Sequence, residues 1–126
     1  MNVIDSSAWL EYFADGPNAD FFAAAVEDAG SQIVPTLSIY EVFKRILQQR
    51  GENDALIAVA VMEQGQVVEL TSSLALAAAH LSVREQLPLA DSVILATARE
   101  YEATLWTQDA DFDGREGVRY RPAEGA

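Results

Sequence analysis

The chain contains no cysteine and only one histidine, His80, which lies in an alanine-rich segment. Without thiols it can form neither a disulfide framework nor a thiolate metal site, and we interpret His80 as a packing or surface residue of a helix. No apolar run approaches the length of about 20 residues that a membrane span needs. The first residues also lack the basic start and long apolar segment of a signal peptide. These absences predict a soluble, cytoplasmic protein with no membrane partner.

Basic residues are scarce as well. Eight lysines and arginines stand against twenty aspartates and glutamates, and the formal net charge is −12. Because phosphate backbones are usually bound by basic patches, this balance argues against a general nucleic-acid binder. Net charge, however, describes the whole surface and not one groove. It favours basic partners, or a cation held in an acidic site.

Short apolar runs alternate with helical patterns along the whole chain. Its 126 residues fit one domain. Strands are predicted at residues 3–4, 33–35, 66–70, 104–107 and 118–120, and helices fill most of the connections. Strands joined by helical crossovers predict an α/β fold, here a three-layer α/β/α sandwich with a central parallel sheet of four to five strands. We expect residues 1–121 to form this domain and residues 122–126 to be a frayed tail.

The first predicted strand ends at Asp5, which is followed by Ser6 and Ser7 and then by a helical pattern. In open α/β sheets, ligands bind outside the carboxyl ends of the strands, so a carboxylate at this position is well placed for chemistry. The alternative is that Asp5 only caps the helix. Ser6 or Ser7 could provide that cap without it.

A second carboxylate, Glu41, lies in the helix after the second strand, and it has two structural explanations. Ser38 and Glu41 have the spacing of a capping box. Lys44 and Arg45 follow three and four residues further on, where surface ion pairs can form. Taken alone, Glu41 is therefore more typical of a structural residue than of a catalytic one.

Asp91 is harder to explain structurally. It lies in the segment Leu87–Ala98, which is apolar on nearly all sides, and a helix of that kind is buried. An ionised aspartate there costs on the order of several kcal/mol unless something pairs with it. Asp109 and Asp111 follow the fourth strand directly, where either could instead be a turn or cap residue.

Together these residues bring carboxylates from four parts of the chain to one edge of the predicted sheet. Carboxylates gathered closely repel one another and raise one another's pKa unless a cation neutralises them. Oxygen ligands without cysteine favour a hard ion, Mg²⁺ or Mn²⁺, over zinc. Such an ion can bind a phosphate oxygen and turn a bound water into a nucleophile. The site therefore predicts metal-assisted phosphodiester hydrolysis.

In this order, the same residues resemble the motifs of a known family. The motifs are Ile4-Asp5-Ser6-Ser7, Ser38-x-x-Glu41, Leu89-Ala90-Asp91 and Thr107-x-Asp109-x-Asp111-Phe112. They are similar to those of PIN-domain ribonucleases, and more narrowly to those of the VapC toxins of VapBC toxin–antitoxin pairs. The resemblance covers the chain from Met1 to about Tyr120.

This resemblance implies an endoribonuclease that depends on Mg²⁺ or Mn²⁺, acts on RNA and is the toxin of a type II toxin–antitoxin system. It also implies a homodimer, inhibited by an antitoxin protein whose basic C-terminal segment occupies the active groove. The implied catalytic residues are Asp5, Glu41, Asp91 and Asp109. The implied metal ligands are the aspartates among them, Asp5, Asp91 and Asp109. The implied supporting residues beside the metal are Ser7, Thr107 and Asp111.

The candidate path for RNA is a basic stripe on the helix that carries Glu41. It consists of Lys44 and Arg45, with Arg50 close by. The alternative, that this stripe is only a solvated helix face, is equally compatible with the sequence.

Three other functions compete with the nuclease. A haloacid-dehalogenase-like phosphatase needs a second aspartate where Ser7 stands, and a response-regulator receiver needs a lysine after its last strand, where the region after Trp106 has none. The third alternative stays open: a non-catalytic PIN-like module that binds metal or RNA without cleaving it.

Overall fold

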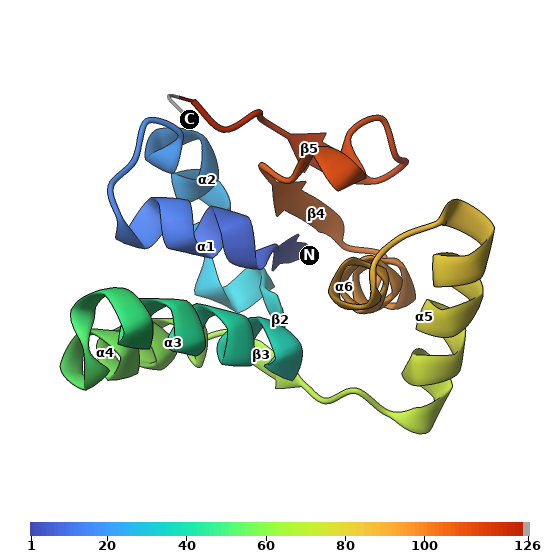
Figure 1. Ribbon diagram of the computed structural model, residues 1–126, viewed down its shortest axis with the longest axis horizontal. Coiled ribbons are helices and arrows are strands. Elements are labelled where there is room, and N and C mark those ends of the chain that lie inside the picture. Colours follow the sequence, from blue (N-terminus) through green and yellow to red (C-terminus); the bar gives the residue numbers. More distant parts are fainter. Residues whose placement is uncertain (125–126) are drawn as a thin grey trace.

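Short strands alternate with helices in the computed structural model of the protein, which describes residues 1–124 (Figure 1). The strands are β1 (Asn2–Ile4), β2 (Ile33–Pro35), β3 (Gln66–Val68), β4 (Thr104–Thr107) and β5 (Val118–Tyr120). The α-helices are α1 (Ser6–Phe13), α2 (Ala19–Val26), α3 (Thr36–Arg50), α4 (Glu52–Met62), α5 (Ser72–Glu85) and α6 (Leu89–Glu100). Two short 3-10 helices, η1 (Ala29–Ser31) and η2 (Ala110–Phe112), precede β2 and β5. Each predicted strand is present, although β3 ends two residues earlier than expected.

The strand pairs in the described residues are all parallel. β4 lies between β1 and β5, with Ile4 opposite Trp106. β2 pairs with β3, and a single bridge between Asn2 and Gln32 connects this pair to β1. The order across the molecule is therefore β3, β2, β1, β4, β5. The sequence predicts one sheet without a break, whereas the ladder between β1 and β2 is reduced to that bridge.

Helices cover both faces of the strands, with α1 to α4 on one side and α5 and α6 on the other (Figure 1). The residues of β4 alternate accordingly. Leu105 packs into the core formed with α5 and α6, and Trp106 packs into the core formed with α1 to α4. The predicted three-layer α/β/α sandwich is therefore confirmed. None of the helices within residues 1–124 is both long enough and apolar enough to cross a bilayer.

The helices do not all begin with the caps that the sequence predicts. At α5 the cap is the hydroxyl of Thr71, which accepts a hydrogen bond from the amide of Leu74 (3.2 Å). At α1, Asp5 occupies the cap position and makes no side-chain cap bond. The prediction that Ser6 or Ser7 caps α1 is wrong, because both hydroxyls donate to carboxylates instead.

The C-terminal end of the described chain is attached to the edge of the sheet. The amide of Arg121 donates to the carbonyl of Thr107 (3.0 Å), and the carbonyl of Pro122 accepts a hydrogen bond from Asn18 Nδ2 (2.9 Å). The start of the predicted frayed tail is thus bonded to the domain. Residues 125–126 of that tail lie outside the described part of the chain.

Phe22, from α2, is fully buried in the core on the side of α1 to α4. Replacing it removes apolar contacts and leaves a cavity, so Phe22→Ala is expected to lower the free energy of unfolding by about 3–5 kcal/mol. Ile57→Ala, at an exposed position of α4, is the control and should change it by less than about 0.5 kcal/mol. Urea denaturation followed by circular dichroism measures both values. Equal losses in the two variants would contradict this description of the core.

Candidate active site

Asp5 is at the carboxyl end of β1, and it is 5% exposed. Its Oδ2 atom accepts hydrogen bonds from the hydroxyls of Ser7 (2.7 Å) and Thr107 (2.9 Å). Thr107 ends β4, the strand beside β1, and its hydroxyl also accepts a hydrogen bond from the amide of Asp109 (2.9 Å). Parallel pairing therefore brings the ends of two strands, and the carboxylates that follow them, to the same edge.

Burial raises the pKa of the Asp5 carboxyl above its ordinary value. The hydrogen bonds from Ser7 and Thr107 lower this pKa because they stabilise the charged form, whereas the negative charges of Asp109 and Glu41 raise it further. Asp5 is thus not a simple helix cap. Side chains from its own helix and from the neighbouring strand hold it as a buried carboxylate.

Glu41 reaches the same edge from α3. Its Oε1 atom accepts a hydrogen bond from the hydroxyl of Ser6 (2.7 Å). The predicted capping box is wrong: Pro35 occupies the cap position of α3 without a side-chain cap bond, and the buried hydroxyl of Ser38 has no partner within residues 1–124. Nor does Glu41 form an ion pair with a basic residue in this part of the chain. Both structural explanations of Glu41 therefore fail.

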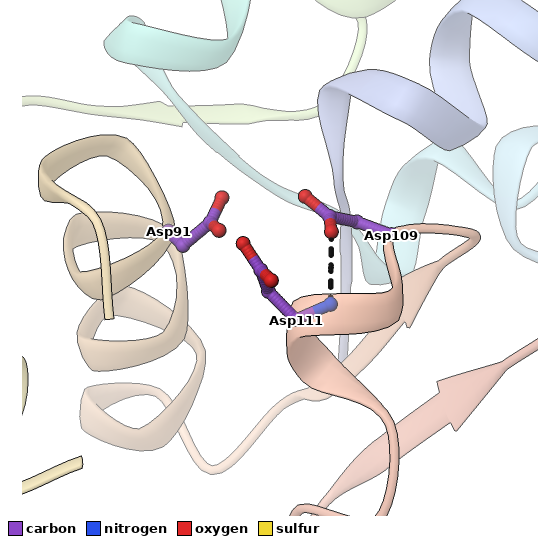
Figure 2. Close-up of side chains that lie close together, drawn as sticks. All are labelled: Asp91, Asp109 and Asp111. Carbon is purple, nitrogen blue, oxygen red and sulfur yellow. Dashed lines mark hydrogen bonds between the residues drawn. The ribbon is translucent and has the colours of Figure 1, made fainter. Parts of the chain in front are cut away.

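Asp91, Asp109 and Asp111 form a compact group of carboxylates (Figure 2). Each contributes one oxygen, and these oxygens all lie within 4.8 Å of one another. Asp91 comes from the first turn of α6, and the other two come from the segment after β4. There the amide of Asp111 donates to Oδ1 of Asp109 (2.9 Å), so Asp109 both caps η2 and belongs to the carboxylate group.

The pKa of Asp91 is raised to about 8. Burial is the largest cause, followed by hydrogen bonding with Asp111, and the charges of Asp109, Asp5 and Asp111 add to the rise. At neutral pH the group therefore favours keeping a proton over full ionisation. Negative charges from other elements thus contribute to the raised pKa of both Asp5 and Asp91 at this edge.

The composition of the group fits a hard divalent cation. All of its ligand atoms are carboxylate oxygens, which Mg²⁺ and Mn²⁺ prefer. Within residues 1–124 no basic side chain neutralises them, since the ion pairs there all involve Glu85. A cation among the three aspartates, with Asp5 behind them, would remove the repulsion that raises the pKa of Asp91.

The structure brings the predicted acidic and supporting residues together, but it groups them differently. The resemblance gives Asp111 a supporting role and Asp5 a direct role in metal binding. In the structure, Asp111 belongs to the compact group with Asp91 and Asp109, and Asp5 lies deeper, bonded to hydroxyls. The deeper position of Asp5 follows from its place at the end of a buried strand.

A groove of about 340 Å³ opens beside Ser7, between α1 and α3. Arg45 and Arg50 line it, together with Gln108 from the loop after β4. Lys44 is not part of this groove, because its ammonium group lies over the ring of Tyr40 (5.6 Å), on a different side of α3. The structure thus brings the two arginines of the predicted RNA path to the groove and leaves the lysine apart.

Two residues of the site are not predicted from the sequence. Ser6 is interpreted there as a helix cap, yet it holds Glu41, which is 35 positions away, and no local pattern indicates such a distant partner. Gln108 lines the groove. Its position between Thr107 and Asp109, directly after a strand, is a signal that could have identified it.

A parallel α/β/α sandwich with carboxylates at the ends of its first and fourth strands is what the resemblance to PIN domains implies. The chain matches the PIN domain family over residues 3–117, and it belongs to this family. Comparison with curated protein sequences gives no match.

Among solved structures, the chain is similar to toxins and to toxin–antitoxin complexes. A toxin–antitoxin complex from Klebsiella pneumoniae aligns with a TM-score of 0.80 and 21% identity, covering 94% of this chain and 96% of that one. VapC20 from Mycobacterium tuberculosis, described as a toxin that cleaves the sarcin–ricin loop, aligns with a TM-score of 0.77 and 19% identity, covering 94% and 99%. The DNA-bound VapBC complex from Salmonella typhimurium gives 0.70 and 12%, covering 96% of both chains. At these identities the likeness shows a shared fold.

The raised pKa of Asp91 predicts how the stability of the metal-free protein depends on pH. The folded protein retains a proton that the unfolded chain, with a pKa of 3.8, releases, so the free energy of unfolding should fall as the pH rises from 3.8 to about 8. Asp91→Asn should flatten this profile. It should also stabilise the protein at pH 8 by about 1–2 kcal/mol, less than the full shift in pKa suggests, because water screens a half-buried group.

Thermal melts in the presence of a chelator, from pH 5 to pH 9, measure this effect. Asp54→Asn, at an exposed position of α4, is the matched control, and its profile from pH 5 to pH 9 should run parallel to that of the wild type. A profile for Asp91→Asn that runs parallel to the wild type would show that Asp91 does not carry the pH dependence.

Proposed function

We propose that the protein is an Mg²⁺- or Mn²⁺-dependent endoribonuclease that acts as the toxin of a type II toxin–antitoxin pair. The observation that carries this proposal is the group of Asp91, Asp109 and Asp111, gathered near the buried Asp5 at the edge of the sheet where α/β folds bind ligands. Membership of the PIN domain family supports it. So does the likeness of the fold to VapC20 and to toxin–antitoxin complexes.

The proposal assigns the cation to Asp91, Asp109 and Asp111, with the buried Asp5 beside them as a further ligand. When bound, Mg²⁺ or Mn²⁺ supplies neutralising charge for the phosphate, a more acidic water and stabilisation of the leaving oxygen. Ser7 and Thr107 fix the orientation of Asp5, because both hydroxyls donate to the same oxygen. Asp91 must release its proton for the site to bind the cation fully, so we expect cation affinity to rise up to about pH 8.

Glu41 has a different role in this proposal. Ser6 holds one of its oxygens, while the other makes no hydrogen bond within residues 1–124. We assign Glu41 the role of general base, which accepts the proton of the attacking water. Attack on phosphorus forms a bond to the water oxygen and breaks the bond to the 3′ oxygen. The 3′ oxygen takes a proton from solvent, so the products carry a 5′-phosphate and a 3′-hydroxyl.

The proposal also covers partners. A basic C-terminal segment of an antitoxin would neutralise the carboxylate group in place of the cation, for instance through an arginine. The net charge of −12 makes a basic partner favourable over the whole surface. A homodimer and a cytoplasmic location, where RNA and a newly made antitoxin are both present, complete the proposal.

Incubation of the purified chain with cellular RNA, with Mn²⁺ or with a chelator, tests this function. We expect Mn²⁺-dependent cleavage that is at least about 10- to 100-fold slower in Asp5→Asn, because that variant weakens the electrostatic hold on the cation. Asp54→Asn is again the control and should cleave as the wild type does. RNA binding without cleavage would favour the non-catalytic module, and neither binding nor cleavage would overturn the proposal.

The groove predicts which basic residues matter for substrate. Arg45→Gln and Arg50→Gln each remove a charge that lines it, so each should raise KM for RNA about 3- to 10-fold, with a weaker dependence of KM on salt. Lys44→Gln makes a matched change of charge on the same helix but outside the groove, and its effect should be smaller. Initial rates of cleavage at low and moderate salt give these values. Equal effects of the three substitutions would indicate a response to overall charge and not to the groove.

A further inference from the structure

Two arginines at the edge of the sheet lie over aromatic rings. The guanidinium group of Arg119, on β5, is 4.6 Å from the centroid of the Trp106 ring and 5.9 Å from that of Phe21. The guanidinium group of Arg121 is 4.4 Å from the centroid of the Phe21 ring. The rings also contact each other, with centroids 5.4 Å apart, and Trp106 Nε1 donates to Oδ1 of Asn2 (2.9 Å). A fixed aromatic surface therefore holds both cations in place. We call Arg119 and Arg121 the arginine pair.

The arginine pair is exposed and has no acidic partner in the described chain. The ion pairs within residues 1–124 join Glu85 to Arg99 and to Arg115, and they leave Arg119 and Arg121 out. In a protein with twenty acidic residues and eight basic ones, two unneutralised guanidinium groups side by side stand out. Stacking occupies the face of a guanidinium group and leaves its N–H edge available, which is the arrangement that binds phosphate.

The arginine pair is also tied to the candidate active site through the backbone. Trp106 is opposite Arg119 in the β4–β5 ladder, and the amide of Arg121 donates to the carbonyl of Thr107 (3.0 Å). The hydroxyl of Thr107 donates in turn to Asp5. The strand β5, which carries Arg119, thus pairs with β4, and the end of β4 leads directly to Asp109 of the candidate site.

A second connection leads from the arginine pair to the groove. Asn18 Nδ2 donates both to the carbonyl of Pro122 (2.9 Å), next to Arg121, and to Oε1 of Gln108 (3.0 Å). Gln108 lines the groove together with Arg45 and Arg50. Asn18 and Gln108 therefore connect the arginine pair to the groove, and Gln108 directly precedes Asp109 in the chain.

We propose that the arginine pair is a second phosphate-binding element for the RNA, in addition to the groove that Arg45 and Arg50 line. This inference rests on the proposed function for its substrate class. It explains how a strongly acidic protein could bind a polyanion: through a few fixed guanidinium groups instead of a broad basic surface. Each arginine would contact one phosphate, and the stacking would reduce the side-chain entropy lost on binding.

The test uses the full chain with Asp5→Asn, which slows cleavage, in the presence of a chelator so that the RNA stays intact. The probe is a fluorescent single-stranded RNA long enough to reach both basic regions. The double variant Arg119→Gln/Arg121→Gln lacks two phosphate contacts, so it should bind this RNA about 20-fold more weakly at 0.1 M salt. It should also reduce the slope of log Kd against log salt concentration by about 1.4. Arg119→Lys/Arg121→Lys keeps the charges and should retain most of the slope. Arg84→Gln, at an exposed position in the last turn of α5, is the control for loss of one charge elsewhere and should bind as the parent does.

Three outcomes decide the matter. Unchanged affinity and slope in the glutamine double variant overturn the inference, and if the wild type still cleaves RNA the proposed function stands. The same variants are also tested for binding to a polyglutamate peptide. If the glutamine double variant still binds RNA as the parent does but no longer binds the peptide, the inference is overturned and the ligand of the arginine pair is an acidic protein segment. No RNA binding by the parent overturns the inference, and if the wild type also fails to cleave RNA the proposed function is overturned with it. Thermal melts of each variant establish that it is folded, and the lysine double variant keeps the test valid if the glutamine one unfolds.

Discussion

The hydrogen bonds that Ser7 and Thr107 donate to Asp5 hold a carboxylate where burial and two further acids oppose its charge. One of these donors comes from the first turn of α1 and the other from the end of β4, so the bonds also fix the helix and the two strands relative to one another. The compact group of aspartates is built on that arrangement, because Asp109 is bonded to the same Thr107 hydroxyl. Burying Asp5 among other acids is electrostatically unfavourable, and the hydrogen bonds from Ser7 and Thr107 offset part of that cost. The hydroxyl of Ser7, which could have capped α1, is used for this purpose instead. Such local costs are typical of functional sites.

The distribution of positive charge matters more here than its total. The eight basic residues fall into five environments. Two neutralise Glu85, two line the groove, two stack on aromatic rings, one lies over Tyr40 and one is exposed on α5. The net charge of the chain therefore says little about whether it can bind a polyanion. It does disfavour non-specific contact away from these positions, since the rest of the surface repels phosphate.

Much of the fold follows from the alternation of apolar runs and helical patterns, because period and turn residues are local properties of the sequence. The five strands, their parallel direction and the three layers could all be predicted in this way. The gathering of acids at one edge could be predicted too, since it follows from where each strand ends. Long-range side-chain pairing could not. Glu41 and Ser38 have a capping-box spacing, but Ser6 binds Glu41 from another helix, and Lys44 and Arg45 are adjacent in sequence yet lie on different sides of α3.

The bonding of Asp109 has a consequence for ion selectivity. Its Oδ1 atom is engaged by the amide of Asp111, and Oδ2 of Asp5 is engaged by two hydroxyls, which leaves one oxygen of each carboxylate without a hydrogen bond in the described chain. A carboxylate with one oxygen free of hydrogen bonds favours binding a cation through that atom. Calcium reaches its six to eight ligands partly by chelation through both oxygens of a carboxylate, whereas magnesium needs about six ligands and takes the remainder from water. If the proposed cation binds at this edge, these hydrogen bonds would therefore favour Mg²⁺ over Ca²⁺.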